Sequence, residues 1–395
     1  MLTPDVVVLV PGFLGFARLG GFYTFADRLM AALRGFLEEP LAGAVPVVPC
    51  TTLPGEALVR RQRHLLDSLV HLTEEKLRGV ERIHLVGHSA GGVDAQLLAC
   101  ATPLEGGVWS RADERVRRRI RSVVTIAAPH YGTGLAESRL AHWGENPLRH
   151  PGALLPEART LLHLALILPR EAAALVGLEL VSPNDAVKFM LEVARHHELI
   201  ADLRPAHMER LRATLEPDPG VSLTCFVTGT EVREDCERAS DPFFRDLYGL
   251  TADSDGSGPT SAVVERCGRL LRRVVKSRPG LVIRSECGAM PAVIDVRLND
   301  GVVNTIRQLV DPDDERQIGG FVVADHGDVL GHYDRQDALI DGPPYNAGLF
   351  HSGAGFGDDE FFTLYRRVAN ALLKSIPGAG FKWDPVPAVV TVQST

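Results

Sequence analysis

The stretch Gly87-His88-Ser89-Ala90-Gly91 places one serine between two glycines, after an apolar run and before a segment with helical character. Glycine at these positions removes the Cβ atoms that would clash where a strand and a helix approach closely. We expect the serine to adopt a sparsely populated backbone conformation that presents its hydroxyl. This pattern indicates a nucleophile, and the alternative is an ordinary strand-to-helix turn in a doubly wound protein.

A serine hydroxyl is a weak nucleophile and needs an oriented base. His326 follows a strand-like run and precedes Gly327, so its loop is able to reach the serine. His332 lies in the polar loop that follows and is the alternative base. His88 sits on the same turn as Ser89, and we expect it to point away from the serine hydroxyl.

The base in turn needs a carboxylate that orients it. Asp300 is the candidate, because it follows an apolar run and Gly301 lets the chain turn away. Glu231 also follows a strand-like run and is the alternative acid, although it lacks the Asp-Gly turn. The order serine, acid and histidine along the chain is one in which such triads occur.

Acyl transfer also requires two hydrogen-bond donors where negative charge develops. The backbone N–H of Ala90 opens the segment after the serine and is one candidate. The backbone N–H of Phe13, in the glycine-rich loop after the first apolar run, is the other.

These residues lie on segments that alternate between strands and helices. Continuous aliphatic runs are typical of strands buried on both faces, and such alternation predicts an α/β fold with a doubly wound, mainly parallel sheet. We interpret 1–395 as a single domain. The predicted strands are 6–10, 45–50 (at an edge, because of its prolines), 83–86, 121–127, 221–229, 292–296 and 321–323, and the predicted helices are 25–36, 58–77, 90–100 and 361–375.

Two segments interrupt the alternation. The first, 137–220, consists mostly of helix-forming residues and is predicted to be a helical cap. Its leucine-rich part, 154–168, is either a lid that opens onto an apolar substrate or a buried core helix. The second insertion, 231–290, is polar, and we predict that it is irregular.

Composition narrows the function classes. The 395 residues carry a formal net charge of −8, with no basic stripe, which argues against a nucleic-acid partner. No apolar stretch approaches the roughly 18 residues of a transmembrane helix.

Pro11 breaks the first apolar run, which therefore resembles a strand more than an export leader, and we expect a cytoplasmic protein with reduced thiols. Cys236, Cys267 and Cys287 lie in one polar region and could form a disulfide if the protein is exported by another route.

Four stretches together resemble the bacterial triacylglycerol lipases and esterases of the α/β-hydrolase superfamily, the group that includes the Pseudomonas, Burkholderia, Staphylococcus and Geobacillus lipases. They are VVVLVPGFLGF, HLVGHSAGG, VVTIAAPHYGTGLAE, and the pair LNDGVVNT with VADHGDVLGH. The resemblance extends from residue 5 to about residue 335, while both insertions match poorly. It implies an α/β-hydrolase fold with Ser89, Asp300 and His326 as the triad, and Phe13 and Ala90 as the oxyanion hole.

The chain departs from this family in its first loop, which reads Pro11-Gly12 where the family usually has His-Gly, and we expect it to differ also by having no export leader. The resemblance also implies a calcium ion beside the histidine loop of many members. Asp328 fits one ligand position and Asp334 is a second candidate, because hard oxygen ligands suit calcium. No other cofactor is expected. The substrate-binding candidates beside the triad are Leu14, His88, His130 and Tyr131.

The sequence therefore predicts a serine ester hydrolase, a lipase or carboxylesterase that cleaves esters of apolar acyl groups through an acyl-enzyme on Ser89. The cap would contact a lipid interface transiently. Three alternatives remain: an acyltransferase on the same triad, a thioesterase or polyester hydrolase, and a binding module with this fold but no catalysis.

Overall fold

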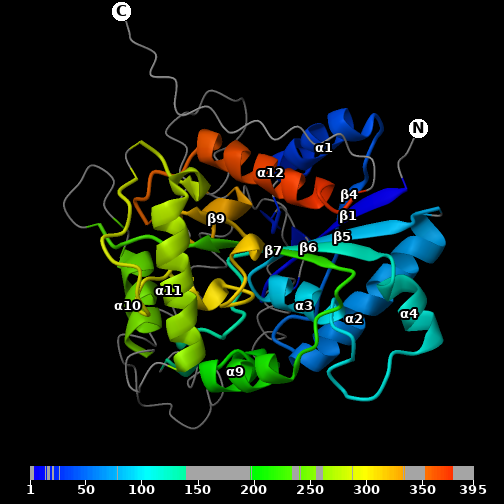
Figure 1. The fold of residues 1–395 in the computed structure, drawn as a ribbon, viewed down its shortest axis with the longest axis horizontal. Helices are drawn as coiled ribbons and strands as arrows, with labels where there is room; N and C mark the ends of the chain where they lie inside the picture. Colours follow the sequence, from blue (N-terminus) through cyan, green and yellow to red (C-terminus); the bar gives the residue numbers. More distant parts are fainter. Residues whose placement is uncertain are drawn as a thin grey trace, which may run out of the picture.

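A computed structural model describes residues 4–13, 15, 18–19, 22–25, 27–77, 79–138, 196, 198–233, 240, 242–254, 261–286, 288–331, 333 and 352–376. Its centre is a seven-stranded sheet in the order β4-β1-β5-β6-β7-β9-β8, and every neighbouring pair is parallel (Figure 1). The strands are β1 (Asp5–Val10), β4 (Val47–Pro49), β5 (Arg82–His88), β6 (Ile120–Ile126), β7 (Ser222–Thr228), β8 (Val282–Ile283) and β9 (Ile318–Val322).

Helices cover both faces of this sheet, as its apolar strands require. In β1, Val7 and Leu9 join the core on one face, and Val6, Val8 and Val10 join the core on the other. Helices α1 and α12 pack on the first face, while α2, α3, α4 and α11 pack on the second (Figure 1). The main helices are α1 (Asp27–Leu41), α2 (Leu58–His71), α3 (Ala90–Leu98), α4 (Arg111–Arg117), α9 (Pro205–Thr214), α10 (Pro242–Ser254), α11 (Ala262–Ser277) and α12 (Asp358–Leu373).

Six of the seven predicted strands are present, and 45–50 lies at the sheet edge as its prolines indicate. The strand predicted at 292–296 is wrong, because this segment consists of bends and irregular chain. The Asp295 carboxylate accepts hydrogen bonds from the backbone N–H groups of Arg297 and Leu298 at 2.9 and 3.2 Å. Such local side-chain bonds compete with a strand ladder. Within this sheet the additional strand is β8, which pairs with β9, and outside it β2 (Arg18–Leu19) and β3 (Phe22–Tyr23) form a separate antiparallel pair.

The prediction that 231–290 is irregular is wrong over much of its described part, which contains α10, α11 and β8. Helix α11 begins after Ser261, whose hydroxyl accepts a hydrogen bond from the Val264 N–H. Its buried side chains recur at helical spacing, which the many arginines between them obscured. Of the three cysteines in this region, the described one, Cys267, is a buried free thiol, and burial raises its pKa to about 12.

Little of the predicted cap, 137–220, falls within the described residues. The leucine-rich stretch 154–168 lies outside them, so the lid stays a prediction. The chain is described again at His196 and continues through α8 (Glu198–Asp202) and α9. None of the described helices combines the length and apolar character needed to cross a membrane.

Candidate active site

The serine turn lies where β5 ends and α3 begins. Ser89 has φ 55° and ψ −135°, a conformation rare for a residue with a side chain. Two backbone hydrogen bonds hold it: its N–H donates to the carbonyl of Ile126 at 3.0 Å, and its carbonyl accepts from the N–H of Gly92 at 2.9 Å. Strain of this kind costs about 1–3 kcal/mol and persists only where the surrounding structure imposes it.

The flanking glycines are required by close backbone contacts. A Cβ on Gly87 would lie 2.3 Å from the carbonyl oxygen of Gly91, and a Cβ on Gly91 would lie 2.3 Å from the carbonyl oxygen of Val10. No side chain fits at either position, because real Cβ atoms do not approach backbone so closely. The pattern of two glycines therefore has the steric origin that the sequence predicts.

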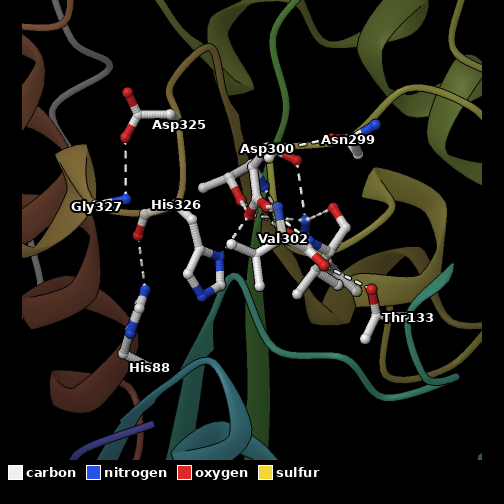
Figure 2. Close-up of polar contacts among 12 residues, drawn as sticks. His88, Thr133, Asn299, Asp300, Val302, Asp325, His326 and Gly327 are labelled. Carbon is white, nitrogen blue, oxygen red and sulfur yellow. Dashed lines mark hydrogen bonds and ion pairs between the residues drawn. The ribbon is translucent and has the colours of Figure 1, made fainter. Parts of the chain in front are cut away.

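His326 and Asp300 meet beyond the carboxyl ends of the strands (Figure 2). The Nδ1 atom of His326 lies 2.9 Å from Oδ2 of Asp300, which is fully buried. A carboxylate only accepts hydrogen bonds, so Nδ1 carries the proton and Nε2 of the neutral ring is left as the basic nitrogen. The backbone N–H of His326 also donates to the carbonyl of Asp300 at 2.9 Å.

Four further donors orient the Asp300 carboxylate. The backbone N–H groups of Val302 and Val303 donate to Oδ1 at 3.0 and 2.8 Å. The Thr228 hydroxyl, at the end of β7, donates to Oδ2 at 2.5 Å, and the side-chain amide of Gln308 lies 3.4 Å from the same oxygen. Both oxygens are thus occupied, which leaves the carboxylate one orientation toward the imidazole.

The two alternatives weighed on the sequence have different positions. Glu231 is partly exposed and accepts a hydrogen bond from the backbone N–H of Ala292 at 2.8 Å. The structure therefore joins His326 to Asp300 rather than to Glu231. The alternative base, His332, lies outside the described residues.

His88, one of the substrate-binding candidates, contacts His326 directly. Its Nε2–H donates to the backbone carbonyl of His326 at 2.9 Å, and the two ring centroids are 4.6 Å apart (Figure 2). The side chain is buried, so it supports the histidine loop from the end of β5. Ser89 is 8% exposed. Its hydroxyl makes no hydrogen bond to another described residue.

The two oxyanion-hole candidates lie beside the serine turn. Ala90 is the first residue of α3, where backbone N–H groups have no partner within the helix. Phe13 packs against the apolar cluster that contains Ala90. Its neighbour Gly12 approaches the serine so closely that a Cβ there would lie 2.8 Å from the Cβ of Ser89. The remaining residue predicted in this loop, Leu14, lies outside the described residues.

The other two predicted substrate-binding residues lie in the interior. His130 is fully buried, its Nε2 is 3.0 Å from the Thr125 hydroxyl, and burial holds the pKa of its imidazole well below the ordinary value. Tyr131 is 4% exposed and packs in the core around β7 and α11. Neither side chain faces solvent, and a contact with substrate stays a prediction.

Sequence analysis missed Asp325, which organises the histidine loop. Its Oδ1 accepts hydrogen bonds from the N–H groups of Gly327 and Asp328, each at 3.0 Å, and Oδ2 accepts one from Ser352 at 3.3 Å. Burial raises the pKa of this carboxyl to about 6. The available signal was its place directly before the histidine and three residues before a second aspartate, a spacing at which carboxylates bond backbone N–H groups.

Calcium beside the histidine loop was expected to use the carboxylate of Asp328. Asp328 uses Oδ2 to accept a hydrogen bond from the backbone N–H of Asp325 at 2.9 Å. Within the described part of the chain, Glu56, His196 and Glu198 are the one group of three side chains able to share a metal, and Asp328 is not among them. Asp334 lies outside the described residues, so a calcium ion here stays a prediction.

No protein-family model matches the sequence, and a search of curated proteins gives no significant match. Solved structures are similar. EstA from Clostridium botulinum is 17% identical with a TM-score of 0.51, covering 94% of this chain and 87% of that chain. Staphylococcus hyicus lipase is 17% identical with a TM-score of 0.48, covering 94% of this chain and 96% of that chain. Lipase 1 from Pelosinus fermentans is 17% identical with a TM-score of 0.48, covering 93% of this chain and 98% of that chain. The parallel sheet and the likeness to EstA confirm the prediction from the sequence: this chain has the α/β-hydrolase fold.

Proposed function

We propose that this protein is a serine ester hydrolase, with Ser89, His326 and Asp300 as its catalytic triad. The observation that carries the proposal is the buried His326–Asp300 pair, which leaves Nε2 of the imidazole as the basic nitrogen. The pair lies at the same edge of the sheet as the end of β5, where Ser89 has its strained backbone conformation. The contact between His88 and His326 supports this further, because it ties the histidine loop to the residue before the serine.

In the proposed reaction, Nε2 of His326 takes the proton from the Ser89 hydroxyl as its oxygen attacks the ester carbonyl carbon. The N–H groups of Phe13 and Ala90 stabilise the resulting oxyanion. Asp300 holds the Nδ1–H and stabilises the imidazolium without taking its proton. The alcohol leaves with the proton from Nε2, and a water molecule activated by the same histidine then hydrolyses the acyl-enzyme.

The missing hydrogen bond between Ser89 and His326 is compatible with this scheme, since catalytic hydrogen bonds often tighten only in the complex with substrate. For the substrate, we propose carboxylic esters with an apolar acyl group. Support comes from the four sequence stretches that resemble those of bacterial lipases. A lid that contacts a lipid interface is part of this proposal.

The proposal is tested with p-nitrophenyl esters of increasing acyl length, hydrolysed by the full chain and by Ser89→Ala. We expect hydrolysis by the wild type and its loss in the variant. A maximum at medium or long chains would support a lipase, and a maximum at acetate would make the protein a short-chain esterase. Equal rates for wild type and Ser89→Ala would reject the triad.

A further inference from the structure

A buried ion pair lies beneath the serine turn. Arg61 of α2 and Asp94 of α3 are both 0% exposed at their side chains. The Nε of Arg61 lies 3.1 and 3.0 Å from the two carboxylate oxygens of Asp94, and Nη2 lies 2.5 Å from Oδ2. Asp94 belongs to the helix whose N-cap is Ser89. The guanidinium is therefore anchored to the element that carries the proposed nucleophile.

The remaining donors of Arg61 reach two loops. Nη2 donates to the carbonyl of Gly12 at 3.1 Å, and Nη1 donates to the carbonyl of Leu53 at 2.5 Å. The two loops also bond each other, because the Thr52 N–H donates to Gly15 at 2.7 Å and the Gly55 N–H donates to Phe13 at 3.4 Å. One guanidinium thus joins α3, the loop after β1, and the loop before α2.

The contact with Gly12 has a direct consequence for Phe13. The carbonyl of Gly12 and the N–H of Phe13 belong to the same peptide unit, which is planar and trans, so they point in opposite directions. Holding the carbonyl toward Arg61 therefore turns the N–H of Phe13 away from Arg61. Gly12 lies against the side chain of Ser89, where the oxyanion would form.

We propose that Arg61 is a positioning residue for the oxyanion hole: through the carbonyl of Gly12 it directs the Phe13 N–H, and through Asp94 it fixes that direction relative to Ser89. This inference rests on the proposed ester hydrolysis. A buried ion pair is weak evidence for stability, because apolar side chains of the same volume often serve as well. The planar fork of arginine is what allows one side chain to hold a carboxylate and two carbonyls at once.

The chain offers a matched control in Arg117 of α4. Its side chain is 7% exposed, pairs with Glu114 at 2.7 Å and Asp218 at 2.8 Å, and donates to the carbonyl of Cys100 at 3.3 Å. Helix α4 leads into the start of β6, while Ser89 follows the end of β5. Arg117 therefore resembles Arg61 in burial and partners but lies away from the serine turn.

The experiment compares Arg61→Lys with Arg117→Lys in the full chain, using a short p-nitrophenyl ester and thermal unfolding of each variant. Lysine keeps the charge but cannot hold three acceptors in one plane. We expect Arg61→Lys to lower kcat by about 10- to 100-fold, the cost of displacing an oxyanion donor by up to about 1 Å, with KM little changed. Arg117→Lys should lower the melting temperature comparably and leave kcat unchanged. Equal effects of both variants on kcat would overturn the inference.

A second readout does not depend on activity. Hydrogen exchange of the Thr52 and Gly55 amides, which donate across the two loops, and of the Gly15 amide, which donates to the Gly12 carbonyl, should be faster in Arg61→Lys than in wild type or Arg117→Lys. Unchanged exchange would reject the positioning role even if the enzyme is active. Faster exchange in Arg61→Lys, combined with a wild type that hydrolyses no ester, would reject the proposed function but not the positioning role. If Arg61→Lys does not fold, the double variant Arg61→Met/Asp94→Leu removes both charges together and takes its place in both measurements.

Discussion

His326 is bound to Asp300 twice: its Nδ1 lies 2.9 Å from the Asp300 carboxylate, and its backbone N–H donates to the Asp300 carbonyl, also at 2.9 Å. The second bond fixes the distance between the two chain segments, and the first fixes the rotation and the tautomer of the ring. The basic Nε2 is therefore presented before any substrate binds. Such preorganisation lowers the cost of orienting the base during the reaction.

The first prediction concerns the acid. Asp300→Asn should lower kcat for ester hydrolysis by about 10⁴, because the amide can donate to Nδ1 and stabilise the tautomer with its proton on Nε2. Glu231→Gln, the matched change at the alternative acid, should leave kcat unchanged. Steady-state rates of both variants decide between the two carboxylates, and a larger loss in Glu231→Gln would contradict the assignment.

The second prediction concerns the hydroxyl that orients Asp300. Thr228→Val keeps the shape of the side chain but removes its hydrogen bond to the carboxylate, so stability should fall by about 1.5–3 kcal/mol. We expect kcat to fall by about tenfold as the carboxylate gains freedom. Thr125→Val, on the neighbouring strand β6, removes a buried hydroxyl bonded to His130 and serves as the control. It should lower stability but not kcat.

The third prediction concerns His88. Replacing it by phenylalanine keeps a ring beside His326 but removes the donor to the His326 carbonyl, so kcat/KM should fall by up to about tenfold. His88→Gln, which again offers an N–H donor, should recover part of the loss. Full activity in His88→Phe would show that the hydrogen bond does not position the histidine loop.

The fourth prediction concerns pH. Burial raises the pKa of Asp325 from 3.8 to about 6. A raised pKa means that the folded state binds this proton more tightly than the unfolded state, so the stabilising effect is full below about pH 4 and is lost as the pH rises through about 6. The free energy of unfolding of the wild type, relative to Asp325→Asn, should therefore decrease by about 2 kcal/mol between pH 4 and pH 7.

Urea unfolding at a series of pH values measures this difference. Because Asn has no titrating group, the variant isolates the contribution of the carboxyl at position 325. A constant difference between the two proteins from pH 4 to pH 7 would mean that the Asp325 carboxyl titrates alike in the folded and unfolded chains.

The sequence was sufficient to predict the sheet and the meeting of His326 with Asp300. Strands buried on both faces leave long aliphatic runs, and the carboxyl ends of parallel strands lie at one edge, so polar residues after different strands come together. The strand predicted at 292–296 was wrong because the hydrogen bonds of Asp295 to the following N–H groups are not visible in a hydropathy pattern.

The supporting residues were harder to find. Arg61 is one of three arginines in the stretch Arg60-Arg61-Gln62-Arg63, and the sequence does not show which of them turns inward. Asp94 did leave a signal, because a single charge inside the otherwise uncharged and mostly apolar helix Ala90–Leu98 implies a buried partner. The identity of that partner depends on tertiary packing between α2 and α3.

The proposed ester hydrolysis depends most directly on Ser89 being the nucleophile. The full chain, treated with a fluorophosphonate probe and digested, should carry one adduct, and mass spectrometry should locate it on Ser89. The Ser89→Ala variant, once circular dichroism has shown that it is folded, should carry no adduct. An adduct at another residue, or none on the folded wild type, would contradict the proposed ester hydrolase, and the latter result would favour a binding module built on the same fold.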